Sequence, residues 1–99
     1  MAQPQLRFFD ALQKYDPEFY KAASGLRDAS RGAALDPKTR ILITMGLDAV
    51  IGASSGVKAL AKQARALGAS EDEIKETLRL VSSVKLNQAL DAAMNAFEE

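Results

Sequence analysis

The chain has 99 residues, enough for one domain but not for two domains of ordinary size. Its 13 basic and 13 acidic residues cancel, which argues against nucleic acid or an anionic membrane as the main partner. No apolar run approaches the ~18 residues of a membrane span, and residues 1–4 lack the pattern of a secretory signal. We therefore expect a cytoplasmic protein without a membrane anchor.

The sequence contains neither cysteine nor histidine. Without cysteine there is no disulfide, no thiol nucleophile and no zinc–sulfur site. Without histidine there is no imidazole general base, no Ser-His-Asp relay and no imidazole metal ligand. The usual routes to catalysis at neutral pH are therefore closed, and we expect neither a metal nor a cofactor.

The chain is typical of an all-α protein, because strict alternation of apolar and polar residues never persists for a useful stretch. Pro4 favours the first turn of a short helix that ends near Lys14. Asp16-Pro17 indicates a second helix start, since Asp accepts a backbone N–H as N-cap and Pro fits the first helical position. We expect this second helix to end near Gly32, with the glycine in the left-handed conformation.

Asp36-Pro37 repeats the same start signal before residues 41–51, which are apolar nearly all round. This composition predicts a central helix that the other helices surround. Residues 52–56 then interrupt the chain, and we expect Ser54 or Ser55 to cap the helix that follows.

Gly68 is expected to end that helix, and Ser70 with Glu73 forms the pattern of a capping box that opens the next one. A last helix is expected from about Val84. The chain thus predicts about six short helices in a compact bundle or an oligomer-forming helical domain.

Two segments carry a resemblance to a known family. Residues 35–40 read Leu-Asp-Pro-Lys-Thr-Arg before the apolar helix, and residues 64–74 read Ala-Arg-Ala-Leu-Gly-Ala-Ser-Glu-Asp-Glu-Ile. In order and spacing they resemble the carboxymuconolactone decarboxylase and alkylhydroperoxidase D-like family, whose junction runs A-x-x-x-G-A-S/T-x-E-E-I. Asp72 replaces the first Glu of that junction.

The resemblance implies an orthogonal all-α helical bundle with residues 35–99 as the family core. Residues 1–34 would form an N-terminal helical hairpin of the same single domain. The resemblance also implies that the chain assembles with itself, as a trimer or hexamer, with no nucleic-acid or membrane partner and with room for a small-molecule ligand.

The peroxidase branch of this family has a Glu on the core helix and a C-x-x-C-x-x-x-H motif that starts at the turn. Laid on this sequence without gaps, these positions fall at Ile41, Ala53, Gly56 and Leu60, none of which can transfer a proton or an electron. The decarboxylase branch needs no cysteine, but it is similar in having a His near Leu60 and acidic residues in the turn. We therefore expect a divergent or non-catalytic homo-oligomer without peroxidase activity.

An active enzyme is the alternative, and Asp48 is its starting point. An unpaired buried carboxylate is costly, so Asp48 needs a partner or a neutral state, and Lys58 and Lys85 are candidate partners. A buried pair of Asp48 and Lys58 beside Ser54 and Ser55 would act as acid and base in decarboxylase- or lactone-type chemistry. The simpler interpretation is that Asp48 caps a neighbouring helix, joins an interface ion pair or faces solvent.

Other patterns support no chemistry. Residues 52–56 fit G-x-S-x-G, but the preceding segment is predicted helical and no His exists. The acidic residues 71–73 are typical of a helix start rather than a metal site.

Aromatic residues gather in the first fifth of the chain, where they indicate a core or a subunit interface: Phe8, Phe9, Tyr15, Phe19 and Tyr20.

A second alternative to the divergent homo-oligomer is a free-standing helical module for protein interaction that only happens to resemble the family. Such a module would be a monomer.

Overall fold

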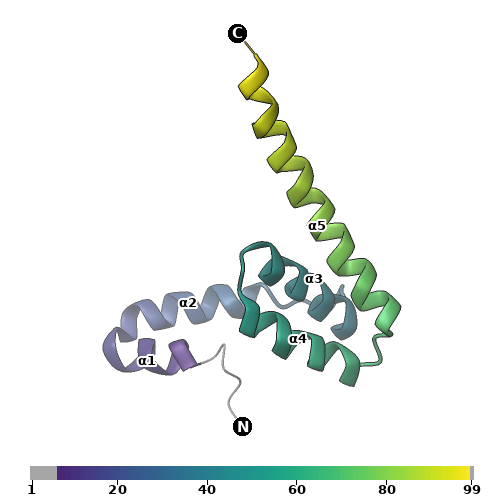
Figure 1. The fold of residues 1–99 in the computed structure, drawn as a ribbon. Coiled ribbons are helices and arrows are strands. Elements are labelled where there is room, and N and C mark those ends of the chain that lie inside the picture. Colours follow the sequence, from purple (N-terminus) through teal and green to yellow (C-terminus); the bar gives the residue numbers. More distant parts are fainter. Residues whose placement is uncertain (1–6, 99) are drawn as a thin grey trace. The chain divides into compact units, whose positions relative to one another are not determined.

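The computed structural model describes residues 7–98, and its regular elements are all helical, which confirms the all-α class (Figure 1). The elements are α1 (Arg7–Tyr15), α2 (Pro17–Ala29), α3 (Pro37–Val50), α4 (Ser54–Ala66), α5 (Glu71–Met94) and the single 3-10 turn η2 (Asn95–Phe97). The chain divides into two compact units, Met1–Asp36 and Pro37–Glu99.

The first unit is a hairpin of α1 and α2. Asp16 is the N-cap of α2, and its Oδ1 accepts a hydrogen bond of 3.1 Å from the backbone N–H of Phe19. Phe9 meets Tyr20 edge to face at 6.2 Å between ring centroids, and the Arg27 guanidinium lies 5.0 Å from the centre of the Phe9 ring. The two helices are thus held by aromatic and cation–π contacts. The helix start expected at Pro4 lies outside the described residues.

The end of α2 differs from the expected glycine terminator. The helix ends at Ala29, and Ser30 caps it in right-handed geometry with its N–H donating to the carbonyl of Leu26. The Ser30 hydroxyl also donates to the carbonyl of Arg27. Because these bonds satisfy the last carbonyls, Gly32 is not needed as a left-handed terminator, and its φ is not positive.

The second unit is built on α3, which packs against both α4 and α5. Its buried core consists of Met45, Leu60, Ala64, Ala69 and Ile74. The expectation that the other helices enclose α3 on all sides is wrong within this unit, since Leu47 is 60% exposed. Only two helices pack on α3 here, and they leave one of its apolar sides open.

Two left-handed glycines shape the reversals of this unit, as expected. Gly52 has a φ of 79° and Gly68 a φ of 93°. After each glycine, the next residue donates its N–H to the carbonyl five residues earlier, Ala53 to Asp48 at 2.8 Å and Ala69 to Ala64 at 2.9 Å. These are Schellman motifs, which satisfy the last carbonyls of α3 and α4.

The serine cap expected for α4 is absent. Ala53 occupies the N-cap without a side-chain hydrogen bond, and Ser54 is already the first helical residue. The Schellman turn at Gly52 determines where the chain reverses, and it places the two serines one and two residues too late to cap.

The helix break expected near Val84 is also absent, because α5 runs without interruption over 24 residues. Its interior contains no glycine or proline, and Ser82 and Ser83 are tolerated within a helix. From residue 82 to residue 98 every side chain is exposed, and α5 extends well past α3 and α4 (Figure 1).

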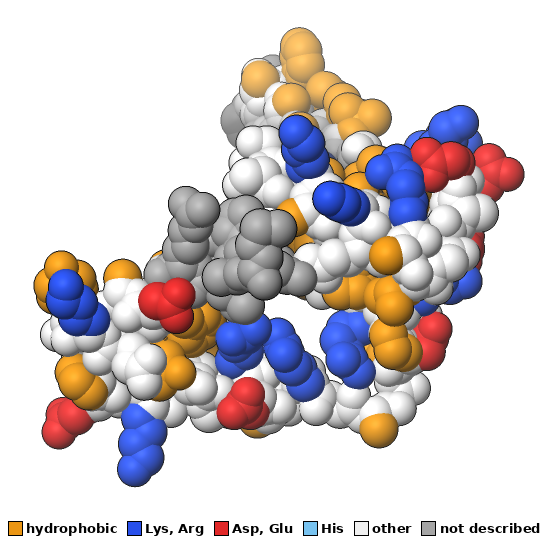
Figure 2. Space-filling view, turned by 90° about the horizontal axis from the view of Figure 1, so that it is seen from below, with side chains coloured by type: hydrophobic (Ala, Val, Ile, Leu, Met, Phe, Trp, Pro, Cys, Tyr) orange, Lys and Arg blue, Asp and Glu red, His pale blue; other side chains and the backbone are white. Residues whose placement is uncertain are grey.

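Hydrophobic side chains lie at the surface of both units (Figure 2). In the part of the chain that the structure describes, no helix combines the length and apolar character that a membrane crossing requires.

Candidate functional site

The turn between α3 and α4 holds the positions at which the resemblance located reactive groups. The N–H of Ala53 donates to the carbonyl of Asp48, and Ser54 donates to the carbonyl of Gly52 at 2.9 Å. These bonds fix Ala53, half-buried, at the N-cap of α4, and they place Gly56 in the first turn of that helix. The backbone therefore brings Ala53, Gly56 and the end of α3 together.

Asp48 lies against Gly56. A Cβ placed on Gly56 would overlap Oδ2 of Asp48 and lie 3.1 Å from its Cγ. The half-buried carboxylate thus occupies the space that any side chain at position 56 would need. Its place at the first turn of α4 is electrostatically favourable, because the N-terminus of a helix attracts negative charge.

The position at which the resemblance implies a histidine is part of the apolar core. Leu60 is 4% exposed and belongs to the same buried cluster as Met45, Ala64 and Ile74. Ile41, at which the resemblance implies a glutamate, is half-buried and packs against this cluster from α3. Both positions therefore contribute apolar side chains to the packing of this unit.

The four residues of the alternative hypothesis, in which the chain is an active enzyme, are not joined by polar contacts. Ser54, Ser55 and Lys58 are exposed, and within residues 7–98 no hydrogen bond or ion pair links their side chains to Asp48. The Thr44 hydroxyl, one turn before Asp48, donates instead to the carbonyl of Arg40 at 2.8 Å.

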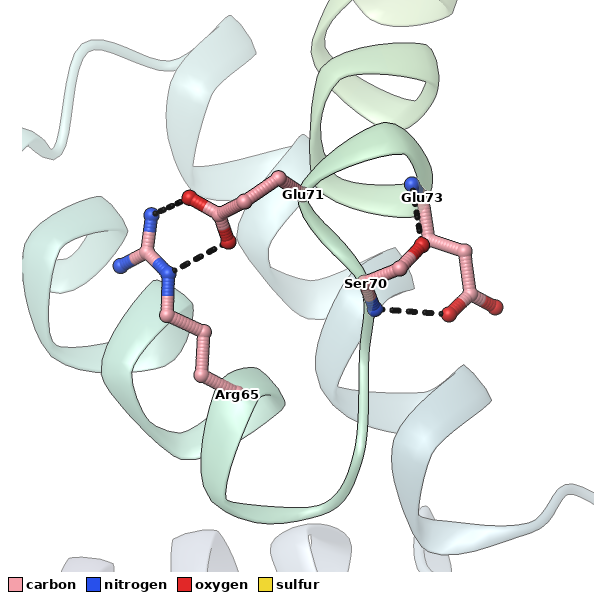
Figure 3. Close-up of polar contacts among 4 residues, drawn as sticks. All are labelled: Arg65, Ser70, Glu71 and Glu73. Atoms are coloured by element: carbon pink, nitrogen blue, oxygen red, sulfur yellow. Dashed lines mark hydrogen bonds and ion pairs between the residues drawn. The ribbon is translucent and has the colours of Figure 1, made fainter.

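The junction between α4 and α5 contains the densest polar contacts (Figure 3). Arg65 at the end of α4 binds Glu71 at the start of α5 through two bonds, Nε to Oε2 at 2.8 Å and Nη2 to Oε1 at 3.0 Å. This hydrogen-bonded ion pair raises the pKa of Arg65 above its usual value and lowers the pKa of Glu71. It clamps the two helix ends across the Gly68 turn.

The expected capping box at Ser70 is confirmed. Ser70 accepts the N–H of Glu73 at 3.0 Å, and its own N–H donates to Oε1 of Glu73 at 2.9 Å. Lys38, from the first turn of α3, reaches the other carboxylate oxygen of Glu73 at 2.9 Å. The hydrogen bond from Ser70, followed by that from Lys38, lowers the pKa of Glu73.

Glu71 and Glu73, two of the three acidic residues 71–73, therefore hold the start of α5 through hydrogen bonds and ion pairs. Among the residues with described positions, no three His, Cys, Asp or Glu side chains form a group suited to a metal ion.

Two shallow grooves lie between α3 and α5. One of ≈ 400 Å³ is bordered by Leu42, Gly46 and Leu47 of α3 and by Thr77 and Leu80 of α5, with Lys38 and Glu73 also in its lining. The other, of ≈ 310 Å³, lies beside Val50 and includes Lys85. Neither groove borders Ala53, Gly56 or Leu60.

The comparison with protein families decides the family assignment. The model of the carboxymuconolactone decarboxylase family matches residues 17–99. The chain belongs to this family. A protein of Methanocaldococcus jannaschii, Uncharacterized protein MJ1511, is 30% identical over 73 residues, which cover 73% of this chain and 68% of that protein.

The turn between α3 and α4 carries no redox-active side chain in this chain. The full sequence has no cysteine and no histidine, and the Asp48 carboxylate fills the space beside Gly56. No pattern in the sequence indicated the contact between Asp48 and Gly56.

Acid should weaken the α4–α5 junction. Folding lowers the pKa values of Glu71 and Glu73, so both contribute stability above their unfolded pKa values. That contribution is lost as the pH falls through the usual carboxylate range, roughly 4.3, towards the lowered folded values. We expect the double substitution Glu71→Gln and Glu73→Gln to reduce the loss of unfolding free energy between about pH 7 and about pH 3.

Urea unfolding at both pH values measures this effect. Glu76→Gln, on an exposed position of the same helix, is the matched control and should retain the acid sensitivity of the unmodified chain. If the double variant and the unmodified chain lose the same free energy of unfolding in acid, Glu71 and Glu73 are not the source of the acid sensitivity.

The contact between Asp48 and Gly56 predicts that the effect of Gly56→Ala on the free energy of unfolding changes sign when Asp48 is removed. Gly56→Ala should lower the free energy of unfolding by about 1–2 kcal/mol, because the new methyl group displaces the Asp48 carboxylate. In an Asp48→Ala background the same substitution should instead be stabilising, by up to about 1 kcal/mol, since Ala is the better helix former.

Gly25→Ala is the control for this cycle, because open space surrounds that position in α2. It should stabilise by about 0.5–1 kcal/mol in both backgrounds. If Gly56→Ala has the same effect with and without Asp48, the two residues are not in contact.

Proposed function

We propose that this member of the carboxymuconolactone decarboxylase family is a homo-oligomer without peroxidase activity, in which the family's reactive positions serve packing. The burial of Leu60 supports this most strongly, because a side chain that is 4% exposed among Met45, Ala64 and Ile74 has no access to substrate. The Asp48 carboxylate over Gly56 adds a second position that no longer has room for a thiol.

The chemistry of thiol peroxidases supports the same conclusion. The reaction needs a cysteine thiolate as nucleophile and a second thiol to resolve the oxidised one. The sequence contains no cysteine, so no residue can cycle between thiol and disulfide.

The exposed apolar surface of the second unit supports self-assembly, as a trimer, a hexamer or a smaller oligomer. Leu47 and Leu80 on either side of the larger groove are 60% and 62% exposed. Extended apolar patches of this kind on a folded chain mark interaction sites.

The alternative function, decarboxylase- or lactone-type catalysis by Asp48 and Lys58 with Ser54 and Ser55, has less support. It requires a proton path between the carboxylate and the amine, whereas Lys58 is exposed and makes no ion pair with Asp48. The interaction-module alternative differs in its oligomeric state, since such a module would be a monomer.

Two readouts on the same purified chain test the proposal. With peroxide and a dithiol reductant, turnover should not exceed that of a heat-denatured control, because the chain supplies no redox-active thiol. Light scattering coupled to size exclusion should give a mass that is a multiple of the chain mass. Turnover above the control would contradict the first half of the proposal, and a monomer would contradict the second.

A further inference from the structure

Helix α5 has two different apolar faces. In its first half, Ile74, Leu78 and Val81 face the core of the second unit. On the other side of this half the exposed residues are charged, and they recur every three or four positions: Asp72, Lys75, Glu76 and Arg79. Residues at this spacing share one side of a helix.

Beyond residue 82 the same side of the helix becomes apolar. Leu86, Leu90, Met94 and Phe97 continue the spacing of the charged residues and are 57%, 49%, 52% and 81% exposed. We call these four residues the C-terminal stripe. Most of the stripe lies on the side opposite Ile74 and Leu78. Only Leu86, at its beginning, also borders the smaller groove beside Val50 of α3.

We propose that two copies of the chain pair through their C-terminal stripes, with the two α5 helices antiparallel. This inference rests on the proposed homo-oligomer and specifies its contact surface. The spacing of three and four residues is that of paired helices, and a two-fold pair buries the same surface on both copies. Full overlap of the two stripes places Leu86 opposite the partner's Phe97 and Leu90 opposite the partner's Met94.

The charges of α5 favour the antiparallel orientation. A parallel pair would align the charged halves of the two helices and place each of Asp72, Lys75, Glu76 and Arg79 beside its own copy, which like-charge repulsion disfavours. In the antiparallel pair each charged half lies beyond the end of the other stripe. The stripe itself carries no charge, so an identical stripe is a compatible partner.

The area of the stripe fits a two-copy contact. Side chains of this size carry on the order of 150–200 Å² of surface, so the four exposed fractions correspond to about 400 Å² per copy. Ser83 and Ala93, which are exposed on the same side of the helix, add little to this surface because their side chains are small. The pair would then bury about 800–900 Å² in total, the size of a weak and reversible contact, so the amount of dimer should rise with protein concentration.

Disulfide trapping tests the pairing, because the natural chain has no cysteine and every introduced thiol is unique. Chains with Leu86→Cys and chains with Phe97→Cys are co-expressed at full length and exposed to a mild oxidant. The mixture should yield a cross-linked dimer that contains one chain of each kind. Either variant alone should cross-link several-fold less, since its two thiols would lie about 16 Å apart along the paired helices.

Ala92→Cys is the matched control, because Ala92 is exposed in the same half of α5 but lies on the side opposite the stripe. Mixed with Leu86→Cys, it should give little cross-linked dimer. Circular dichroism checks that each variant keeps the helicity of the unmodified chain.

Three results would overturn the inference in distinguishable ways. Strong cross-linking of Leu86→Cys with itself and of Phe97→Cys with itself would show a parallel pair. Absence of cross-linking in their mixture, while light scattering shows an oligomer, would refute this surface but leave the proposed homo-oligomer intact. A monomeric unmodified chain would refute both.

Discussion

The second unit depends on a small apolar core, in which the fully enclosed side chain of Met45 joins α3 to residues of α4 and of the α4–α5 junction. Besides Gly46, only five described residues are buried, so each of these five supplies a large share of the apolar stabilisation. Leu60 is one of the five, and its replacement by a polar group would remove packing that few other side chains replace.

This constraint connects the fold to the proposed loss of activity. An imidazole at position 60 would need water or a hydrogen-bond partner, because a buried polar ring without one is costly. Here Leu60 and Ile41 contribute to the core instead, and the Asp48 carboxylate covers Gly56. The turn between α3 and α4 is set by its backbone, including the left-handed Gly52, and not by polar side-chain contacts.

Local signals predicted most helix boundaries. Asp16-Pro17, Gly52, Gly68 and the Ser70 capping box work through bonds between residues a few positions apart, so the sequence alone was sufficient. The continuity of α5 was missed because a loss of apolar periodicity near Val84 resembles a helix end. In the structure it reflects a change in which side of one helix is apolar.

The contacts around the candidate site could not be predicted from the sequence. The spacing of the resemblance assigned reactive positions to Ala53, Gly56 and Leu60, an assignment that stays a prediction. No sequence pattern connects Asp48 with Gly56, or Lys38 with Glu73. These contacts arise from the angle at which α3 crosses its neighbours, which depends on packing of the whole unit. The same reason applies to Gly46, where a Cβ would lie 2.9 Å from Cγ1 of Val81.

The most direct test of the central claim is the denaturant stability of Leu60→His, which restores an imidazole at the family position. The account predicts a loss on the order of 3 kcal/mol in the free energy of unfolding, because a polar ring enters an apolar core without a hydrogen-bond partner. Leu67→His, at a side chain that is 45% exposed at the end of the same helix, should cost far less. If Leu60→His is as stable as Leu67→His, position 60 still accommodates a catalytic group and the claim that it serves packing is wrong.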